Sequence, residues 1–308
     1  MVDKIICIVG PTASGKTGLA IELAKKIDAE IISADSMQIY KGLDVGTAKV
    51  TKEEAQGIPH HLIDICNIDE NFSVAEFKQM CYDKIEEIRS RGKNVIIAGG
   101  TGLYINAVVY NMNFNEEVVD LEYRNELENI AKEKGNNYLH SMLEKIDPIT
   151  ANKIHKNNVK RVIRAIEMAK NVKLKSIHML EEEERIQKEN GKYEFVIFCI
   201  NQEREYLYNR INLRVDLMLK DGILDEAKKI YDMKLPNNNT CMQAIGYKEF
   251  FPYFEGKITL DEAIDTLKKE TRHYAKRQMT WFNNKLECIK LDGSKQKNEL
   301  VDEILKKL

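Results

Sequence analysis

Short apolar runs alternate with stretches of helical periodicity along the first hundred residues, which predicts an α/β fold. The runs are bounded by polar or turn-forming residues and are the right length for buried strands: Lys4–Val9, Glu30–Ser33 and Asn94–Ala98, with a shorter one at His61–Ile65. Between His61–Ile65 and Asn94–Ala98, apolar residues recur about once per helical turn, at Phe77, Cys81, Ile85 and Ile88. This spacing predicts a helix over Val74–Arg89 with these side chains on its inner face.

The pattern changes after Tyr110. From about 115 to 190 the sequence is charged, helical in period and poor in strand signals. Apolar runs typical of strands return at Tyr193–Ile200 and Glu287–Leu291, and helices are predicted at Glu205–Lys220, Leu224–Asp232 and Leu260–Asn284. The simplest organisation is a core formed by residues 1–113 and 192–308, interrupted by an all-helical insertion at 114–191.

The first strand is followed directly by a phosphate-binding sequence. Gly10-Pro11-Thr12-Ala13-Ser14-Gly15-Lys16-Thr17 matches the P-loop pattern G-x-x-x-x-G-K-[ST], and a helical pattern follows it. The glycines allow backbone N–H groups to turn toward an anion, Lys16 adds a positive charge, and the Thr17 hydroxyl is a candidate ligand for Mg²⁺. The alternative, a glycine-rich turn without a ligand, fits the flanking strand and helix less well. The fold class is therefore α/β, with a P-loop NTPase-like parallel sheet and a helical insertion.

The composition indicates which cellular compartment the protein belongs to and whether it contacts a membrane. The 308 residues are 43% hydrophobic and 31% charged, and the net charge is −2. The six cysteines are scattered, with no C-x-x-C pair, which disfavours structural zinc and favours reduced thiols in the cytoplasm. No apolar run approaches the roughly 20 residues of a membrane span, so we expect a cytoplasmic protein without membrane contact, and a monomer by default.

Basic residues are concentrated in two stretches despite the balanced total. Lys153–Lys175 contains eight Lys or Arg against Glu167 alone, and Lys268–Lys285 contains six against Glu270 alone. Such stretches are often only the solvated faces of helices, so they suggest a polyanionic partner without establishing one.

Two polar residues lie where predicted strands end. Asp35 follows the second strand, and Thr101 follows Asn94–Ala98 within Gly99-Gly100-Thr101-Gly102. Ligands of parallel α/β sheets bind at the carboxyl ends of the strands, so Asp35 is a candidate general base or metal ligand. A turn or N-cap role for Asp35, and a plain glycine turn at Gly99–Gly102, remain the structural alternatives.

These motifs belong to an ordered series along almost the whole chain. After the P-loop come DSMQIY from Asp35, GTAK from Gly46, HHLID from His60 and GGTGLY from Gly99, and further matches are DPITANKIH from Asp147, KRVIRAIE from Lys160, QAIGYKE from Gln243 and AKRQMTWF from Ala275. The set resembles the bacterial tRNA dimethylallyltransferases (tRNA isopentenyltransferases), with weaker matches near 110–145 and 175–200.

The resemblance implies transfer of a dimethylallyl group from its diphosphate to N6 of adenosine 37, just 3′ of the tRNA anticodon, with Mg²⁺ as cofactor. Lys16, Thr17 and the rest of the P-loop would then bind the leaving diphosphate, with Thr12 and Ser14 as hydroxyl donors. Asp35 matches the family's base or orienting acceptor, and Arg214 matches the arginine that reaches the diphosphate. Arg210, one helical turn from Arg214, would instead pair with a surface acid.

The resemblance also implies a surface for the anticodon stem-loop, from which the target base must be flipped out. The residues that match it are Asp35, Ser36, Met37, Gln38, Thr101, Arg124, Lys160, Arg161, Arg164, Gln243, Gly246, Tyr247, Lys276, Arg277, Gln278 and Trp281. Trp281, the only tryptophan, could stack on a base, but a lone tryptophan in an amphipathic helix is more often part of the core.

Three other functions compete with tRNA prenylation. Prenylation of free AMP or ADP would use the same donor, but the basic insertion favours RNA. A nucleotide or small-molecule kinase would explain the P-loop alone. An RNA-binding module without activity would leave Lys16 and Asp35 without a role.

Overall fold

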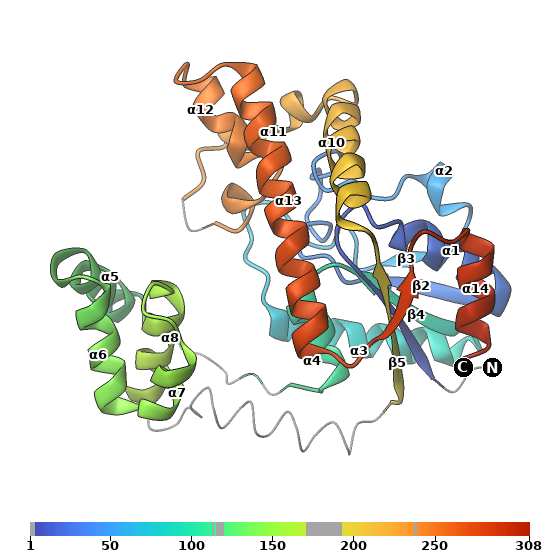
Figure 1. Cartoon of the computed structure of the whole chain (residues 1–308), viewed down its shortest axis with the longest axis horizontal. Coiled ribbons are helices and arrows are strands. Elements are labelled where there is room, and N and C mark those ends of the chain that lie inside the picture. The colour runs from blue at the N-terminus through green and yellow to red at the C-terminus, as the bar shows by residue number, and fades with distance from the viewer. Residues whose placement is uncertain (1–3, 113, 115–119, 171–192, 237–238) are drawn as a thin grey trace. The chain divides into compact units, whose positions relative to one another are not determined.

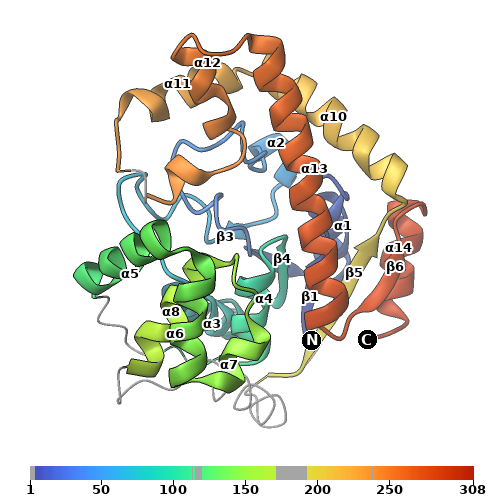
Figure 2. The same ribbon diagram turned by 60° about the vertical axis from the view of Figure 1, so that its left-hand side comes forward.

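The computed structural model describes residues 4–112, 114, 120–170, 193–236 and 239–308. By its internal contacts the chain divides into two compact units (Figures 1 and 2). Met1–Val108 and Lys192–Leu308 form the first, called the core unit here, and Val109–Gly191 forms the second, the helical unit.

The core unit is built on a parallel sheet, which confirms the predicted fold class. The described strands form a six-stranded sheet in the order β3-β2-β4-β1-β5-β6, and every pair is parallel. The strands are β1 (Ile5–Val9), β2 (Ala29–Ser33), β3 (His60–His61), β4 (Asn94–Gly99), β5 (Phe195–Asn201) and β6 (Ile289–Asp292). Because β1 and β2 are both paired with β4, the loops that follow these three strands emerge side by side.

The prediction of a strand at His61–Ile65 is wrong beyond its first residue. Only His60 and His61 pair with β2. Leu62 and Asp64 then adopt positive φ angles of 59° and 56°, which an extended strand cannot contain. The apolar residues in this segment serve a tight turn instead of a longer strand.

Helices cover the sheet on its two faces. On one face α1 and the C-terminal α14 pack around Leu19, Leu23 and Leu300; on the other, the Phe77 ring of α3 stacks on the Tyr104 ring of α4 at 4.0 Å. The helices of the N-terminal half are α1 (Lys16–Ile27), α2 (Lys52–Ala55), α3 (Val74–Ser90) and α4 (Gly102–Val109).

The C-terminal half of the core unit adds a group of helices beyond the sheet. The helix α10 (Arg204–Lys220) packs on the long α13 (Leu260–Lys285), as Figure 1 shows. The remaining elements are α11 (Ile223–Asp232), the 3₁₀ turns η1 (Cys241–Gln243) and η2 (Lys248–Phe250), α12 (Phe251–Phe254) and α14 (Lys297–Leu305). Their shared core includes Tyr247 and Phe250, both fully buried.

The described part of the helical unit contains α5 (Leu121–Lys134), α6 (Asn136–Ile146), α7 (Pro148–Lys153) and α8 (Val159–Lys170). Leu127, Leu139, Leu143 and Ile166 form its own small core. Residues 171–191, which the sequence assigned to the end of the insertion, lie outside the described residues, as does residue 192.

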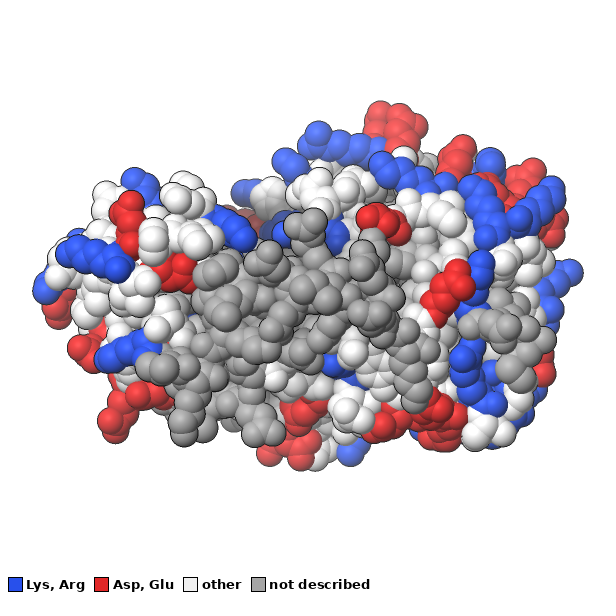
Figure 3. Space-filling view, turned by 90° about the horizontal axis from the view of Figure 1, so that it is seen from below, with Lys and Arg blue, Asp and Glu red and all other residues white. Residues whose placement is uncertain are grey.

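Lys and Arg side chains are interspersed with Asp and Glu on the described part of the face in Figure 3, in keeping with the net charge of −2. Among the helices that the structure describes, none is long and apolar enough to cross a membrane.

Candidate active site

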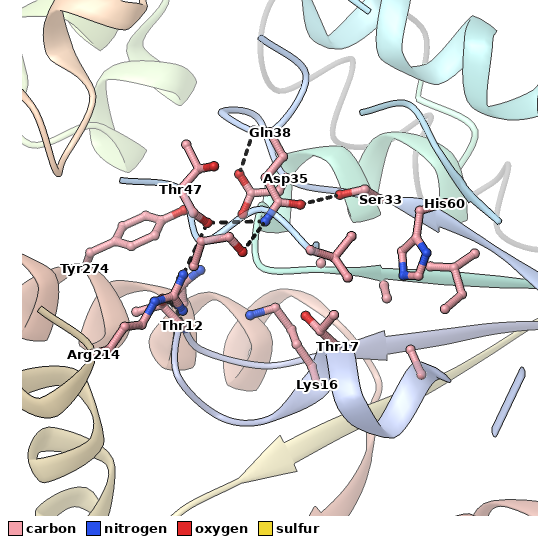
Figure 4. Close-up of a pocket in the computed structure, with 17 residues that line it drawn as sticks. Thr12, Lys16, Thr17, Ser33, Asp35, Gln38, Thr47, His60, Arg214 and Tyr274 are labelled. Atoms are coloured by element: carbon pink, nitrogen blue, oxygen red, sulfur yellow. Dashed lines mark hydrogen bonds between the residues drawn. The ribbon is translucent and has the colours of Figure 1, made fainter. Parts of the chain in front are cut away.

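Three strand-end loops meet at the carboxyl edge of the sheet. The P-loop follows β1, Asp35 follows β2, and Gly100 and Thr101 follow β4. Figure 4 shows that Lys16, Asp35 and Arg214 of α10 point into one cavity, with Thr17 beside Lys16. The structure therefore brings together three residues that the sequence analysis singled out, Lys16, Asp35 and Arg214, although Arg214 lies almost 180 residues after Asp35 in the chain.

The conformation of the P-loop is held by its own backbone and by α13. Gly15, at the N-terminus of α1, has a φ of +89°, a left-handed conformation that favours glycine. Gln278 accepts a hydrogen bond from the Thr12 N–H (2.8 Å) and donates one to the Gly100 carbonyl (2.9 Å). The Ser14 hydroxyl is buried and has no hydrogen-bond partner, so this loop retains an unused donor.

Two cations face the cavity. Lys16 Nζ contacts the Pro11 carbonyl (3.2 Å), and loss of hydration lowers the pKa of Lys16 to about 8, despite the opposing effect of the Asp35 carboxylate. Arg214 donates to the Thr12 hydroxyl (3.1 Å) and to the Thr47 carbonyl (3.2 Å), while its Nε atom is buried without a partner. Burial also lowers the pKa of Arg214. Two poorly hydrated cations near one carboxylate form a site suited to an anion.

Arg210 does not make the predicted ion pair. Within the described part of the chain no acid lies at ion-pair distance from its guanidinium, which is 5.8 Å from the centre of the Tyr206 ring instead. Tyr206 precedes it by one helical turn on α10, so a neighbouring ring replaces the expected acid.

Asp35 is fixed by its own turn. Its Oδ1 atom accepts hydrogen bonds from the N–H groups of Met37 (2.9 Å) and Gln38 (3.4 Å). Thr101 supports the same turn, because its hydroxyl accepts from the Ser36 N–H at 2.9 Å. The turn role anticipated as the alternative for Asp35 is therefore real, and it leaves the Oδ2 atom for other contacts.

Two of the cavities at the site adjoin each other at Asp35. The first, of about 80 Å³, is lined by Lys16, Thr17, Asp35 and Arg214, and by small or apolar residues such as Ala20. The second, of about 380 Å³, is lined by the Ser36–Met37 turn, by Gln243–Gly246 and by Arg277. Thr12, Asp35, Thr47, Arg214 and Tyr274 line both. Asp35 thus lies where the two cavities meet.

Tyr274 is the aromatic residue at this junction. Burial, and to a smaller extent the nearby Asp35 carboxylate, raises the pKa of its phenol. The phenol therefore stays protonated and can donate a hydrogen bond throughout the physiological pH range.

The residues of the core unit predicted to contact tRNA fall into two groups. Ser36, Met37, Gln243, Gly246 and Arg277 line the larger cavity, and Lys276 is exposed nearby in the sequence. The other group is structural: Gln38 bonds Ser33 and the Thr47 carbonyl, and Gln278 holds the P-loop.

Two aromatic residues in the predicted tRNA set support the interior instead. Tyr247 is fully buried and donates its hydroxyl to Glu226 at 2.6 Å, so its side chain offers no surface to a tRNA. The half-buried Trp281 indole donates to Asn106 (3.1 Å) and packs on α4 at Gly102, which fixes it against the core unit.

The predicted tRNA contacts of the helical unit lie on two of its helices. Lys160, Arg161 and Arg164 are exposed on α8, while Val162, Ile163 and Ile166 fill the unit's core from the opposite face. Arg124 of α5 is paired with the Glu167 carboxylate at 2.6 Å, so it joins α5 to α8.

Three residues of the site region were not predicted from the sequence. His60 lines the smaller cavity, and its buried Nε2 atom has no partner. The Thr47 carbonyl binds Arg214, and Glu226 binds the loop that contains Thr47. His60 lies in the HHLID motif and Thr47 in the GTAK motif, so these motifs could have pointed to both residues. Glu226 lies in none of the motifs, so nothing in the sequence pattern pointed to it.

Comparison with known proteins connects this geometry to a family. Residues 38–285 match the model of the IPP transferase family. The chain is 54% identical to the tRNA dimethylallyltransferase of Acetivibrio thermocellus, over 91% of this chain and 88% of the relative, and 48% identical to that of Halalkalibacterium halodurans, over 92% and 90%.

Solved structures agree with the sequence comparison. The full-length tRNA isopentenylpyrophosphate transferase of Bacillus halodurans superposes with a TM-score of 0.73 at 45% identity, covering 99% of this chain and 95% of the other. A eukaryotic dimethylallyltransferase acting on tRNA gives 0.75 at 30% identity, over 94% and 74%. The chain therefore belongs to the IPP transferase family.

Proposed function

We propose that this protein transfers a dimethylallyl group from dimethylallyl diphosphate to N6 of adenosine 37 in tRNA. The observation that carries the proposal is the pairing of Lys16 and Arg214 in one cavity, with Asp35 at the junction to a second. Prenyl transfer needs a site that receives a diphosphate anion next to a site that holds a nucleophile. Relatives that match most of the chain carry the name of this activity.

The smaller cavity would take the donor. As the allylic C–O bond breaks, negative charge grows on the departing diphosphate. Lys16 and Arg214, which point into this cavity (Figure 4), would stabilise that charge together with P-loop N–H groups. The flipped adenine would occupy the larger cavity beside the Ser36–Met37 turn. When N6 forms its bond to the allylic carbon, it gives up a proton, and the Asp35 carboxylate would accept or orient that proton.

Mg²⁺ fits the chemistry of the donor set. Among the described residues no group of three or more His, Cys, Asp or Glu side chains could hold a metal by itself. Mg²⁺ commonly takes few protein ligands together with substrate phosphates and water. Thr17, with its hydroxyl at the cavity, would bind the ion alongside the diphosphate, and the bound ion would supply further charge neutralisation.

The helical unit would hold the anticodon stem through Lys160, Arg161 and Arg164, exposed cations suited to phosphate. The division of the chain into the core unit and the helical unit then separates chemistry from RNA recognition. Monomeric action in the cytoplasm is part of the proposal, and the cytoplasmic location agrees with the six cysteines, which are free thiols.

The test is an acceptor comparison with purified protein, Mg²⁺ and radiolabelled dimethylallyl diphosphate. An unmodified anticodon stem-loop with adenosine at positions 36 and 37 should become labelled, and one with guanosine at position 37 should not. Labelling of AMP in place of the stem-loop would move the assignment to free-nucleotide prenylation. Phosphate release from ATP without prenyl transfer would make the protein a kinase or ATPase.

A further inference from the structure

Glu226, in the first turn of α11, is bound by four donors from other parts of the core unit. Its Oε2 atom accepts hydrogen bonds from the backbone N–H groups of Asp44 and Val45, and its Oε1 atom accepts from that of Gly46, all at 3.0 Å. The Tyr247 hydroxyl is the fourth donor, at 2.6 Å. One carboxylate thus satisfies the hydrogen bonds of three successive backbone N–H groups in a loop that forms no helix or strand.

The same loop also holds Arg214 at the smaller cavity, the one proposed for the prenyl donor. The Thr47 carbonyl accepts hydrogen bonds from Arg214 (3.2 Å) and from the Gln38 amide (3.3 Å). Thr47 is the residue directly after Gly46, so a displacement of the backbone at Gly46 moves the carbonyl that holds Arg214.

The packing around Gly46 leaves the loop little freedom. A Cβ atom at Gly46 would lie 2.5 Å from the Tyr247 ring, and Gly246 packs against the Gly46 carbonyl from the same side. Lys49 closes the loop beyond Thr47 by pairing with Asp44 and Asp64, each at 2.6 Å. The loop is therefore packed closely against Tyr247 and bound by Glu226.

We propose that Glu226 is a positioning residue for the prenyl donor: it fixes the Asp44–Ala48 loop so that the Thr47 carbonyl holds Arg214 against the diphosphate. The inference rests on the proposed function for the identity of the prenyl donor. The contacts from Glu226 through the loop to Arg214 do not depend on that function. Glu226 contributes through the loop and touches no substrate. Removing its charge should weaken donor binding and leave tRNA binding unchanged.

The test compares Glu226→Gln and Tyr247→Phe with Asp225→Asn. In Glu226→Gln, an amide NH₂ group would replace one carboxylate oxygen. This NH₂ group cannot accept the N–H or O–H groups that now bond to that oxygen, so the loop would shift. We expect the KM for dimethylallyl diphosphate to rise about tenfold in Glu226→Gln, since small misplacements of a charged clamp cost one to two orders of magnitude. Tyr247→Phe removes one of four donors and should give a smaller rise in the same direction. Glu226→Asp keeps the charge and should recover part of the loss.

Asp225→Asn is the matched control, because Asp225 is exposed on the same helix turn and loses the same charge. It should leave the donor KM unchanged. The Kd for the stem-loop, measured without donor, should be the same in all variants, and circular dichroism should show them folded. A folded Glu226→Gln protein with the wild-type donor KM would overturn the inference, as would an equal loss in Asp225→Asn.

Two further measurements keep the outcomes distinct. If Glu226→Gln does not fold, an unchanged donor KM in Tyr247→Phe overturns the inference. Calorimetric binding of inorganic diphosphate separates it from the proposed function. Wild-type protein that binds diphosphate but prenylates nothing would refute the function, while weaker diphosphate binding by Glu226→Gln would still support the role of Glu226.

Discussion

Lys16 illustrates how the fold alters one side chain. Its free-enzyme pKa of about 8 means that the ammonium is largely present at neutral pH and is lost as the pH rises above 8. The diphosphate binds the charged form and raises the pKa of the bound lysine, so donor affinity should fall with increasing pH above 8, by at most about tenfold per unit. Donor KM measured from pH 6.5 to 9.5 tests this. The Lys16→Ala variant should bind donor weakly throughout and lose the inflection near pH 8.

Asp35 allows the turn and the proton transfer to be separated. In Asp35→Asn, the amide oxygen can still accept from Met37 and Gln38, so the turn is retained while the carboxylate charge is lost. We expect kcat to fall by about a hundredfold or more, the usual scale for loss of a general base, with stem-loop Kd unchanged. Wild-type turnover in a folded Asp35→Asn protein would remove Asp35 from the chemistry.

At the scale of elements, the sequence predicted well what depends on local pattern. The strands β1, β2 and β4 and the residues after them could be placed because buried runs end in polar residues with recognisable chemistry. His61–Ile65 was misjudged because hydrophobicity does not report the positive φ angles at Leu62 and Asp64. The Thr47–Arg214 contact could not be derived from local pattern, because it joins a backbone carbonyl to a side chain 167 residues away.

The helix α8 carries the prediction that belongs to this scale. Arg161→Ala and Arg164→Ala should each weaken stem-loop binding and reduce the slope of log K against log salt by about 0.7 to 0.9 if each contacts one phosphate. Lys145→Ala, at an exposed position of α6, is the comparison within the same unit. A salt slope that none of these changes affects would make the α8 cations an ordinary solvated face.

The two chain segments that connect the core unit to the helical unit both run past Tyr82 in the core unit. Tyr82 donates its hydroxyl to the Val108 carbonyl at 2.7 Å, and its ring stacks on Tyr193 at 5.9 Å. The chain therefore leaves and re-enters the core unit beside one side chain. Replacing Val109–Gly191 with a short Gly-Ser linker should give a folded core unit, because loop closure over such a span costs little.

This shortened protein should bind inorganic diphosphate within about twofold of the intact chain, a change of under 0.5 kcal/mol, since the cavity residues belong to the core unit. It should lose at least about tenfold in stem-loop affinity, as expected when several phosphate contacts are removed. Retention of full stem-loop affinity would show that the helical unit is not the RNA clamp.

The lowered pKa of Lys16 has a consequence for reactivity. With a pKa of about 8, roughly a tenth of Lys16 is a neutral amine at pH 7, far more than for an ordinary exposed lysine. The neutral amine is a nucleophile and attacks aldehydes. An aldehyde that carries a phosphate would be drawn into the cavity by Arg214 and would form a Schiff base with Lys16 in preference to the other lysines. Reduction with borohydride and peptide mapping would locate the label, and inorganic diphosphate should protect against it. The residue that holds the leaving group in the reaction is thus also a handle for covalent inhibitors.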